Sequence, residues 1–199
     1  MELLDAADDV IRREGPGASM DVIAREAGIT NPILYRHFGH KGGLYTALAE
    51  RYAHALMNEI MDSLERADDP KARLALTIDT YFSWLESEPQ VYRFLVHRAQ
   101  TEQREVHDAI GDFVRDVALE VAAVARAELL GADEPGNERG DFAEPLAFAV
   151  VGAVQMAGEW WLEHRETSCA QLVEELVTLV WGGFERYAAR STSREEVVS

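Results

Sequence analysis

Polar and basic side chains gather in one short segment of the chain, residues 29–45, which contains no acidic residue. The segment reads ITNPILYRHFGHKGGLY, and no Asp or Glu occurs between Glu26 and Glu50. Hydroxyl, amide and guanidinium groups are side-chain groups that contact base edges and phosphates in duplex DNA. Acidic residues here would face phosphates of the same charge. The segment therefore has the composition of a local nucleic-acid-binding surface.

The chain as a whole is strongly acidic. Its 199 residues include 36 Asp and Glu against 19 Lys and Arg, which gives a net charge of −17. Such a field repels phosphate, so it argues against non-specific coating of nucleic acid, and any DNA contact must be local. The single cysteine, Cys169, cannot form an internal disulfide and favours a reducing, cytoplasmic setting. The sequence shows neither a signal peptide nor an apolar run long enough to span a membrane.

Apolar residues recur with helical spacing over nearly the whole chain, and no stretch alternates as a strand does. Glycines, prolines and capping residues divide this pattern into segments. The segment 131–140 is expected to be a loop, and the polar tail from residue 191 is expected to be frayed. An all-α protein of about nine helices is predicted, with helices at 3–14, 20–26, 31–37, 41–66, 72–85, 89–97, 102–130, 142–164 and 168–189.

Residues 19–38 have the spacing of a helix-turn-helix. Ala24 is small where two helices must cross closely, and Gly28 stands where a tight turn requires a positive φ. The buried face is expected to consist of Ile23, Ala27, Ile29, Leu34 and Phe38. The second helix would then expose groups suited to a DNA groove, namely Thr30, Asn31, Ile33, Tyr35, Arg36 and His37. Lys41 begins the next helix, where the positive helix end also favours a phosphate.

This pattern resembles the DNA-binding domain of the tetracycline-repressor (TetR/AcrR-type) family of bacterial regulators. The resemblance covers residues 3–48, and the positions that carry it are Ala27, Gly28, Ile29, Thr30, Leu34, Tyr35, His37, Phe38, Lys41 and Leu44. It implies an N-terminal three-helix helix-turn-helix domain (residues 1–45) and a larger C-terminal helical ligand-binding and dimerisation domain (residues 46–199). It also implies a cytoplasmic homodimer that binds a palindromic operator in double-stranded DNA.

The resemblance assigns roles to individual residues. By position, Thr30, Tyr35 and Lys41 would contact phosphates, and Tyr45 is a weaker candidate for the same role. The residues nearest the base edges would be Asn31, Pro32, Ile33, Arg36 and His37. Because Asp8 and Asp9 reduce the field near DNA, the expected affinity is modest and sensitive to salt.

The later helices carry two further sets of candidate residues. Bulky side chains on the fifth to eighth helices either pack a core or line a cavity for a hydrophobic effector; the candidates are Tyr81, Trp84, Leu85, Phe94, His97, Phe113, Met156 and Trp160. The last two helices carry apolar stripes expected to form a four-helix dimer interface, in which we place Val150, Val154, Leu172, Leu176, Val180, Trp181 and Phe184. Effector binding would tilt the helix that begins at Lys41 and spread the second helices of the two helix-turn-helix motifs.

An enzyme and a small-molecule carrier are the alternatives to a regulator. The sequence contains no GxSxG motif, no phosphate-binding glycine loop and no metal-ligand spacing among its six histidines, so no enzymatic activity, cofactor or metal is predicted. The alternative is an all-helical carrier that binds a small molecule without specific DNA binding. A carrier would not need the acid-free segment. The segment therefore favours a ligand-responsive transcriptional regulator, most simply a repressor.

Overall fold

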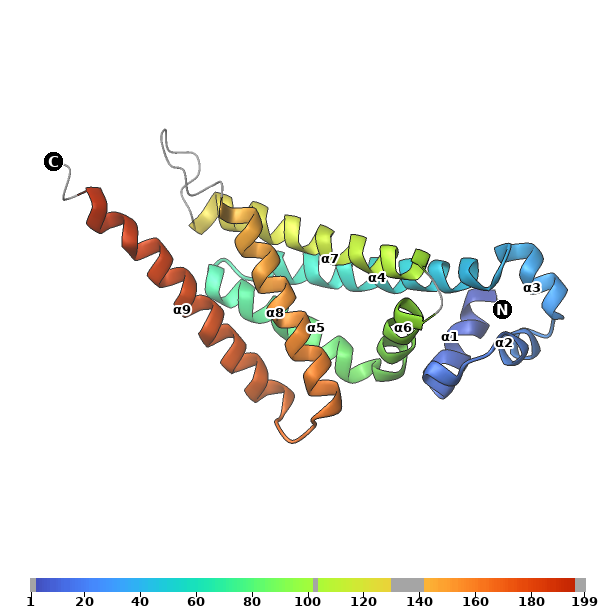
Figure 1. Cartoon of the computed structure of the whole chain (residues 1–199). Coiled ribbons are helices and arrows are strands. Elements are labelled where there is room, and N and C mark those ends of the chain that lie inside the picture. The colour runs from blue at the N-terminus through green and yellow to red at the C-terminus, as the bar shows by residue number, and fades with distance from the viewer. Residues whose placement is uncertain (1–2, 102–103, 130–141, 196–199) are drawn as a thin grey trace. The chain divides into compact units, whose positions relative to one another are not determined.

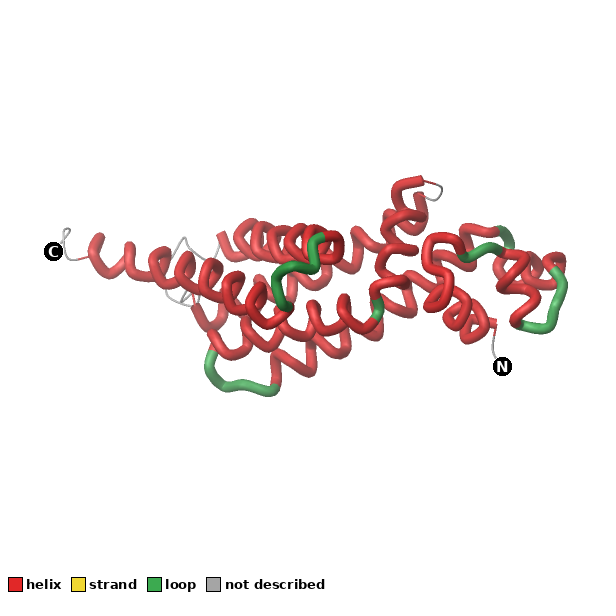
Figure 2. Tube along the Cα trace, turned by 90° about the horizontal axis from the view of Figure 1, so that it is seen from below, coloured by secondary structure: helices red, strands yellow, loops and turns green. Residues whose placement is uncertain are grey.

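The computed structural model describes residues 3–101, 104–129 and 142–195, and these residues form helices joined by short connections (Figures 1 and 2). No strand occurs among them, which confirms the predicted all-α class. The order is α1 (Leu3–Glu14), the 3-10 turn η1 (Gly15–Gly17), α2 (Met20–Glu26), α3 (Asn31–Phe38), α4 (Lys41–Glu65), α5 (Pro70–Ser87), α6 (Pro89–Thr101), α7 (Arg104–Val124), the π-helical turn η2 (Ala125–Leu129), α8 (Ala143–Glu163) and α9 (Cys169–Glu195).

Side-chain caps are present at several helix starts among the described residues. The Ser19 side chain accepts a hydrogen bond from the Val22 N–H, 3.4 Å away, and so caps α2. Asp69 does the same for α5, where its Oδ2 lies 2.8 Å from the Ala72 nitrogen, so this helix begins at Pro70 and not at residue 72. The predicted end of the last helix at residue 189 is wrong, because α9 continues to Glu195. The residues that follow include no Gly or Pro to stop it.

The chain divides into two compact units. The first comprises Met1–Asn58 and Trp84–Phe113, and the second comprises Glu59–Ser83 and Val114–Ser199. The predicted loop 131–140 lies outside the described residues. None of the helices in the described part of the chain combines the length and hydropathy needed to cross a lipid bilayer.

The core of the first unit gathers the apolar faces of α1, α2, α3, α4 and α6. Ile11, Ile23, Leu34, Leu48 and Phe94 are all fully buried in this one cluster. Leu34 is the side chain of α3 that enters it deepest, and Phe38 packs against its edge. The core therefore holds α3 by its apolar side and leaves the rest of that short helix accessible.

The core of the second unit includes an aromatic contact between α5 and α8. The ring of Phe82 meets that of Trp161 edge-on, with centroids 5.8 Å apart. The Trp161 indole N–H donates to the Thr167 carbonyl at 2.8 Å, and the Arg165 guanidinium lies 3.9 Å from the centre of a Trp161 ring. Trp161 thus fixes the end of α8 and the turn that leads into α9.

Candidate nucleic-acid interface

The turn between α2 and α3 is built as the sequence predicts. Gly28 has φ +67°, which is the left-handed conformation that glycine adopts without steric cost. The Gly28 N–H donates to the Arg25 carbonyl at 3.1 Å, and the Ile29 N–H donates to the Ala24 carbonyl at 2.9 Å. These two bonds form a Schellman motif, which satisfies carbonyls at the end of α2 and turns the chain into α3.

The outer face of α3 carries the side chains predicted to meet DNA. Pro32, Tyr35, Arg36 and His37 are exposed, with Tyr35 at 37%. Thr30 is exposed at the N-cap position, although its side chain makes no capping hydrogen bond. Asn31 and Ile33 are half-buried. The fold therefore presents the predicted set on one short helix, and the DNA contacts of these residues stay predictions.

The junction between α3 and α4 depends on a second turn. Gly39 has φ +73°, and the His40 N–H donates to the Phe38 carbonyl at 2.8 Å. The Gly43 N–H lies 3.2 Å from the Nδ1 atom of His40, which accepts its hydrogen bond and so caps the first turn of α4. This capping role of His40 was not predicted from the sequence. It fixes the start of the helix whose first residue is Lys41, a residue whose side chain lies outside the described part of the structure.

One predicted phosphate contact needs correction. The side chain of Tyr45 is fully buried, with its ring 5.1 Å from that of Phe94 and perpendicular to it. Tyr45 lies on the apolar side of α4 and belongs to the core of the first unit. Its hydroxyl is therefore not on the surface that α3 presents, and we remove Tyr45 from the candidate interface.

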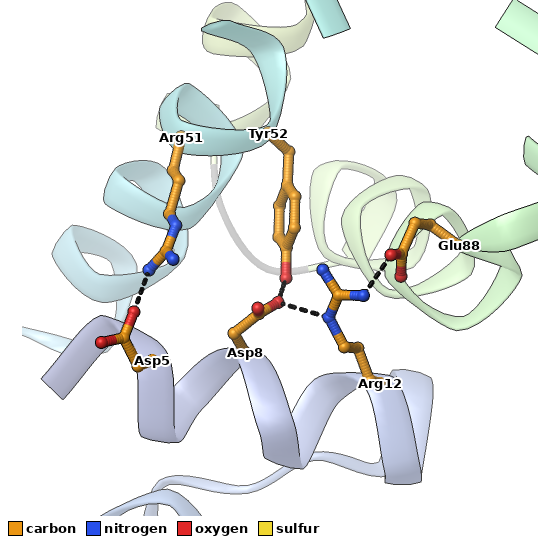
Figure 3. A network of polar contacts seen from close by, with 6 residues as sticks. All are labelled: Asp5, Asp8, Arg12, Arg51, Tyr52 and Glu88. Carbon is orange, nitrogen blue, oxygen red and sulfur yellow. Dashed lines mark hydrogen bonds and ion pairs between the residues drawn. The ribbon is translucent and has the colours of Figure 1, made fainter. Parts of the chain in front are cut away.

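A polar network joins α1 to α4 and to the residue before α6 (Figure 3). Asp8 accepts hydrogen bonds from the Tyr52 hydroxyl and from Nε of Arg12, the latter at 3.1 Å, and Arg12 also pairs with Glu88. Arg51 lies 2.8 Å from Asp5. Partial burial lowers the pKa of the Arg12 guanidinium, but the hydrogen bonds and charges of Asp8 and Glu88 outweigh it and raise that pKa above its ordinary value. The acidic residues of α1 thus link this helix to α4, and Arg12 links it to Glu88.

The residues predicted to bind an effector belong to both units and differ in burial. Leu85 and Phe94 are fully buried in hydrophobic packing, and His97 is exposed. Trp84 is half-buried and meets Tyr92 edge-on, whereas Tyr81 meets Phe82 in the same way. Phe113 is half-buried. Met156 and Trp160 are 63% and 50% exposed on α8, and the effector contacts of the whole set stay predictions.

The predicted dimer residues are buried or half-buried in the single chain. Leu176 is buried, and the others are half-buried: Val150, Val154, Leu172, Val180, Trp181 and Phe184. The apolar side chains that face outward are Phe148, Met156 and Trp160 on α8 and Leu179 on α9. This exposed face of α8 is also visible in the sequence, since Ala149, Ala153, Met156 and Trp160 recur at i, i+4, i+7 and i+11.

A helix-turn-helix whose second helix is exposed, at the start of an all-α chain, defines the class of helix-turn-helix DNA-binding proteins. The sequence comparisons identify the family within this class. Residues 3–48 match the family described as bacterial regulatory proteins of the tetR family. Residues 59–196 match the tetracyclin repressor-like C-terminal domain. The chain belongs to the tetracycline-repressor family of transcriptional regulators, which confirms the resemblance seen in its sequence.

Similar proteins agree with this assignment. A helix-turn-helix-type transcriptional regulator of Mycobacterium tuberculosis is 32% identical over 181 residues, which cover 90% of this chain and 74% of the relative. The transcriptional activator FasR of Mycolicibacterium smegmatis is 29% identical over 184 residues, which cover 92% of this chain and 81% of FasR.

Solved structures share the fold. A tetR-family regulator from Streptomyces coelicolor matches with a TM-score of 0.75 and 21% identity, over 95% of this chain and 81% of that one. The regulator FadR of Bacillus subtilis, solved in complex with stearoyl-CoA, matches with a TM-score of 0.71 and 16% identity, over 89% of this chain and 95% of FadR.

Proposed function

We propose that this protein is a ligand-responsive regulator, most simply a repressor, that binds a palindromic operator as a homodimer. Each subunit would insert α3 into a major groove, with the two copies about 34–36 Å apart or at a near multiple of one DNA turn. Residues 1–45 would bind DNA, and residues 46–199 would bind the effector and form the dimer. A small-molecule carrier without DNA binding is the alternative.

The observation that carries the DNA-binding half of this proposal is the exposed face of α3. Tyr35, Arg36 and His37 project from a helix held by Leu34, and no acidic residue lies in the first turn of α3. A carrier has no use for such a surface, because its ligand would be bound elsewhere. The surface offers one guanidinium for base edges or phosphates and one phenol for a phosphate.

Binding to DNA over a range of salt concentrations tests this half of the proposal. We expect the protein to bind a fragment from upstream of its own gene more tightly than random duplex DNA, with affinity falling steeply as salt rises. Tyr35→Ala and Lys41→Ala should weaken binding to all sequences, whereas Arg36→Ala should relax the preference for one base pair, at a cost of about 1–3 kcal/mol. Equal affinity of the wild type for both fragments would favour the carrier.

For the effector, we propose a hydrophobic molecule that contains an acyl chain. Two features support this choice: the aromatic side chains of α5 and α6, and the stearoyl-CoA bound by the structurally similar FadR. Stearoyl-CoA is therefore the first probe. It should change the fluorescence of the wild type by way of the half-buried Trp84 and change DNA affinity by about 5- to 150-fold, the range of ordinary allosteric coupling.

Free coenzyme A is the control for that experiment, since it lacks the acyl chain. An equal response to both compounds would contradict an acyl-binding site. A reporter assay gives the sign of regulation. When the protein is bound at its operator, a repressor lowers transcription of the reporter gene and an activator raises it.

A further inference from the structure

An acidic residue lies against α3, although the acid-free segment itself contributes none. Asp21 stands in the first turn of α2, and its Oδ1 atom accepts a hydrogen bond from the Nδ2 group of Asn31, the first residue of α3. Beside a carboxylate, an amide must present its NH2 group, because its oxygen would be repelled. Asp21 therefore fixes which way the Asn31 amide is turned.

The other end of the same amide is turned inward. The Oδ1 atom of Asn31 is buried and has no hydrogen-bond partner among the described residues. An amide NH2 group carries two hydrogens, and Asp21 takes one of them. The half-buried Asn31 can thus offer the remaining N–H, but no acceptor, to a group that approaches α3.

We propose that Asp21 determines sequence specificity by acting through Asn31. This inference rests on the proposed function, in which α3 enters the major groove. There, guanine, adenine and thymine each present an acceptor, whereas cytosine presents only its N4 amino donor. An asparagine held as a donor can pair with guanine, adenine or thymine but not with cytosine. An asparagine free to turn over could pair with either kind of edge.

The carboxylate of Asp21 has a second, separable effect. Its negative charge close to α3 lowers the affinity for every DNA sequence, because it repels phosphates. Asp21→Asn removes this charge but keeps an oxygen that can accept from Asn31. Asp21→Ala removes both the charge and the acceptor. The two variants therefore distinguish the orientation of the amide from the electrostatic field.

The test uses full-length wild type, Asp21→Asn, Asp21→Ala and Asn31→Ala in selection from a randomised duplex library. Affinities are then measured on operators that carry each of the four bases at each half-site position. We expect the wild type to disfavour cytosine at one position per half-site by roughly 10-fold. Asp21→Asn should keep part of that discrimination, because its amide can accept from Asn31 but can also donate to it, and should bind all sequences more tightly. Asp21→Ala and Asn31→Ala should lose the discrimination at the same position.

Asp9→Ala is the matched control, because it removes an exposed acid from α1 of the same unit. It should change overall affinity and salt dependence but no base preference. The double variant Asp21→Ala/Asn31→Ala should show the same base preference as Asn31→Ala, since Asp21 acts on that preference through Asn31, and should bind all sequences more tightly because the charge is gone. Circular dichroism and thermal melting establish that each variant is folded.

Two results would overturn the inference without touching the regulator assignment. One is a base preference that persists at every position in both Asp21→Ala and Asn31→Ala. The other is an identical loss of preference in Asp21→Asn and Asp21→Ala, which would make charge the cause. A wild type without any sequence preference would overturn the operator function, and this inference with it.

Discussion

The backbone of Phe38 leaves no room for a side chain at position 43. A methyl group built on Gly43 would overlap the Phe38 carbonyl oxygen, which belongs to the backbone and cannot turn away. The same glycine donates its N–H to His40 and so takes part in the cap of α4. The junction that follows α3 therefore requires glycine at position 43 because a side chain would not fit there. The backbone of Gly43 itself has an ordinary helical conformation.

Gly43→Ala should therefore lower the free energy of unfolding by about 1–3 kcal/mol, the usual cost of overpacking. Urea denaturation followed by circular dichroism measures the change. Gly111→Ala on α7 is the control, because no atom lies within 4 Å of the added methyl group. That variant should gain up to about 1 kcal/mol through helix propensity. Equal effects of the two substitutions would contradict the steric account.

At the scale of helices, the polar network of Figure 3 determines how α1 is attached. Asp8 is the centre of this network, since it accepts from both Tyr52 on α4 and Arg12 on α1. Arg12 is about half exposed, so its ion pairs contribute little to stability in water. The Tyr52 side chain is 6% exposed, and its hydrogen bond to a carboxylate is the stronger contribution.

Tyr52→Phe should accordingly destabilise the protein by about 1–2 kcal/mol, because it removes a donor from a partly buried carboxylate. Urea denaturation again gives the value. Tyr35→Phe, which changes an exposed tyrosine on α3, should stay within about 0.5 kcal/mol of the wild type. A loss in Tyr52→Phe no larger than that of Tyr35→Phe would show that the Asp8 contact contributes no stability.

At the scale of the whole molecule, α8 and α9 expose apolar side chains in the single chain. Met156 and Leu179 are 63% and 70% exposed. An assembly in which copies of these helices pair would remove them from water, which is favourable in proportion to the area buried. A symmetric dimer places the same face on both subunits. We therefore extend the proposed dimer interface to Phe148, Met156, Trp160 and Leu179.

The double variant Met156→Lys/Leu179→Lys should be a monomer, because a charge buried at an interface without a partner is strongly unfavourable. Size-exclusion chromatography with light scattering gives the mass. Leu119→Lys is the control, since Leu119 is an exposed leucine of α7 outside the proposed interface. The wild type and the control should both be dimers. A double variant that remains a dimer would place the interface elsewhere.

The sequence by itself determined the helices and the turn between α2 and α3. Local chemistry decides these features, because a cap such as Ser19 or a glycine such as Gly28 acts within a few residues of the chain. Apolar spacing likewise predicted that Leu34 and Phe38 face the core and that Tyr35 and Arg36 lie on the accessible side of α3.

Only the tertiary structure decided which distant residues meet. Helical spacing cannot distinguish a surface tyrosine from a core one near a helix start, so the burial of Tyr45 against Phe94 required the packing of α4 on α6. In the same way, Asp21 lies outside the acid-free segment in sequence, and the turn at Gly28 brings it to Asn31. A charge pattern along the chain shows only which residues are close in sequence. The contact between Asp21 and Asn31 depends on which residues are close in space.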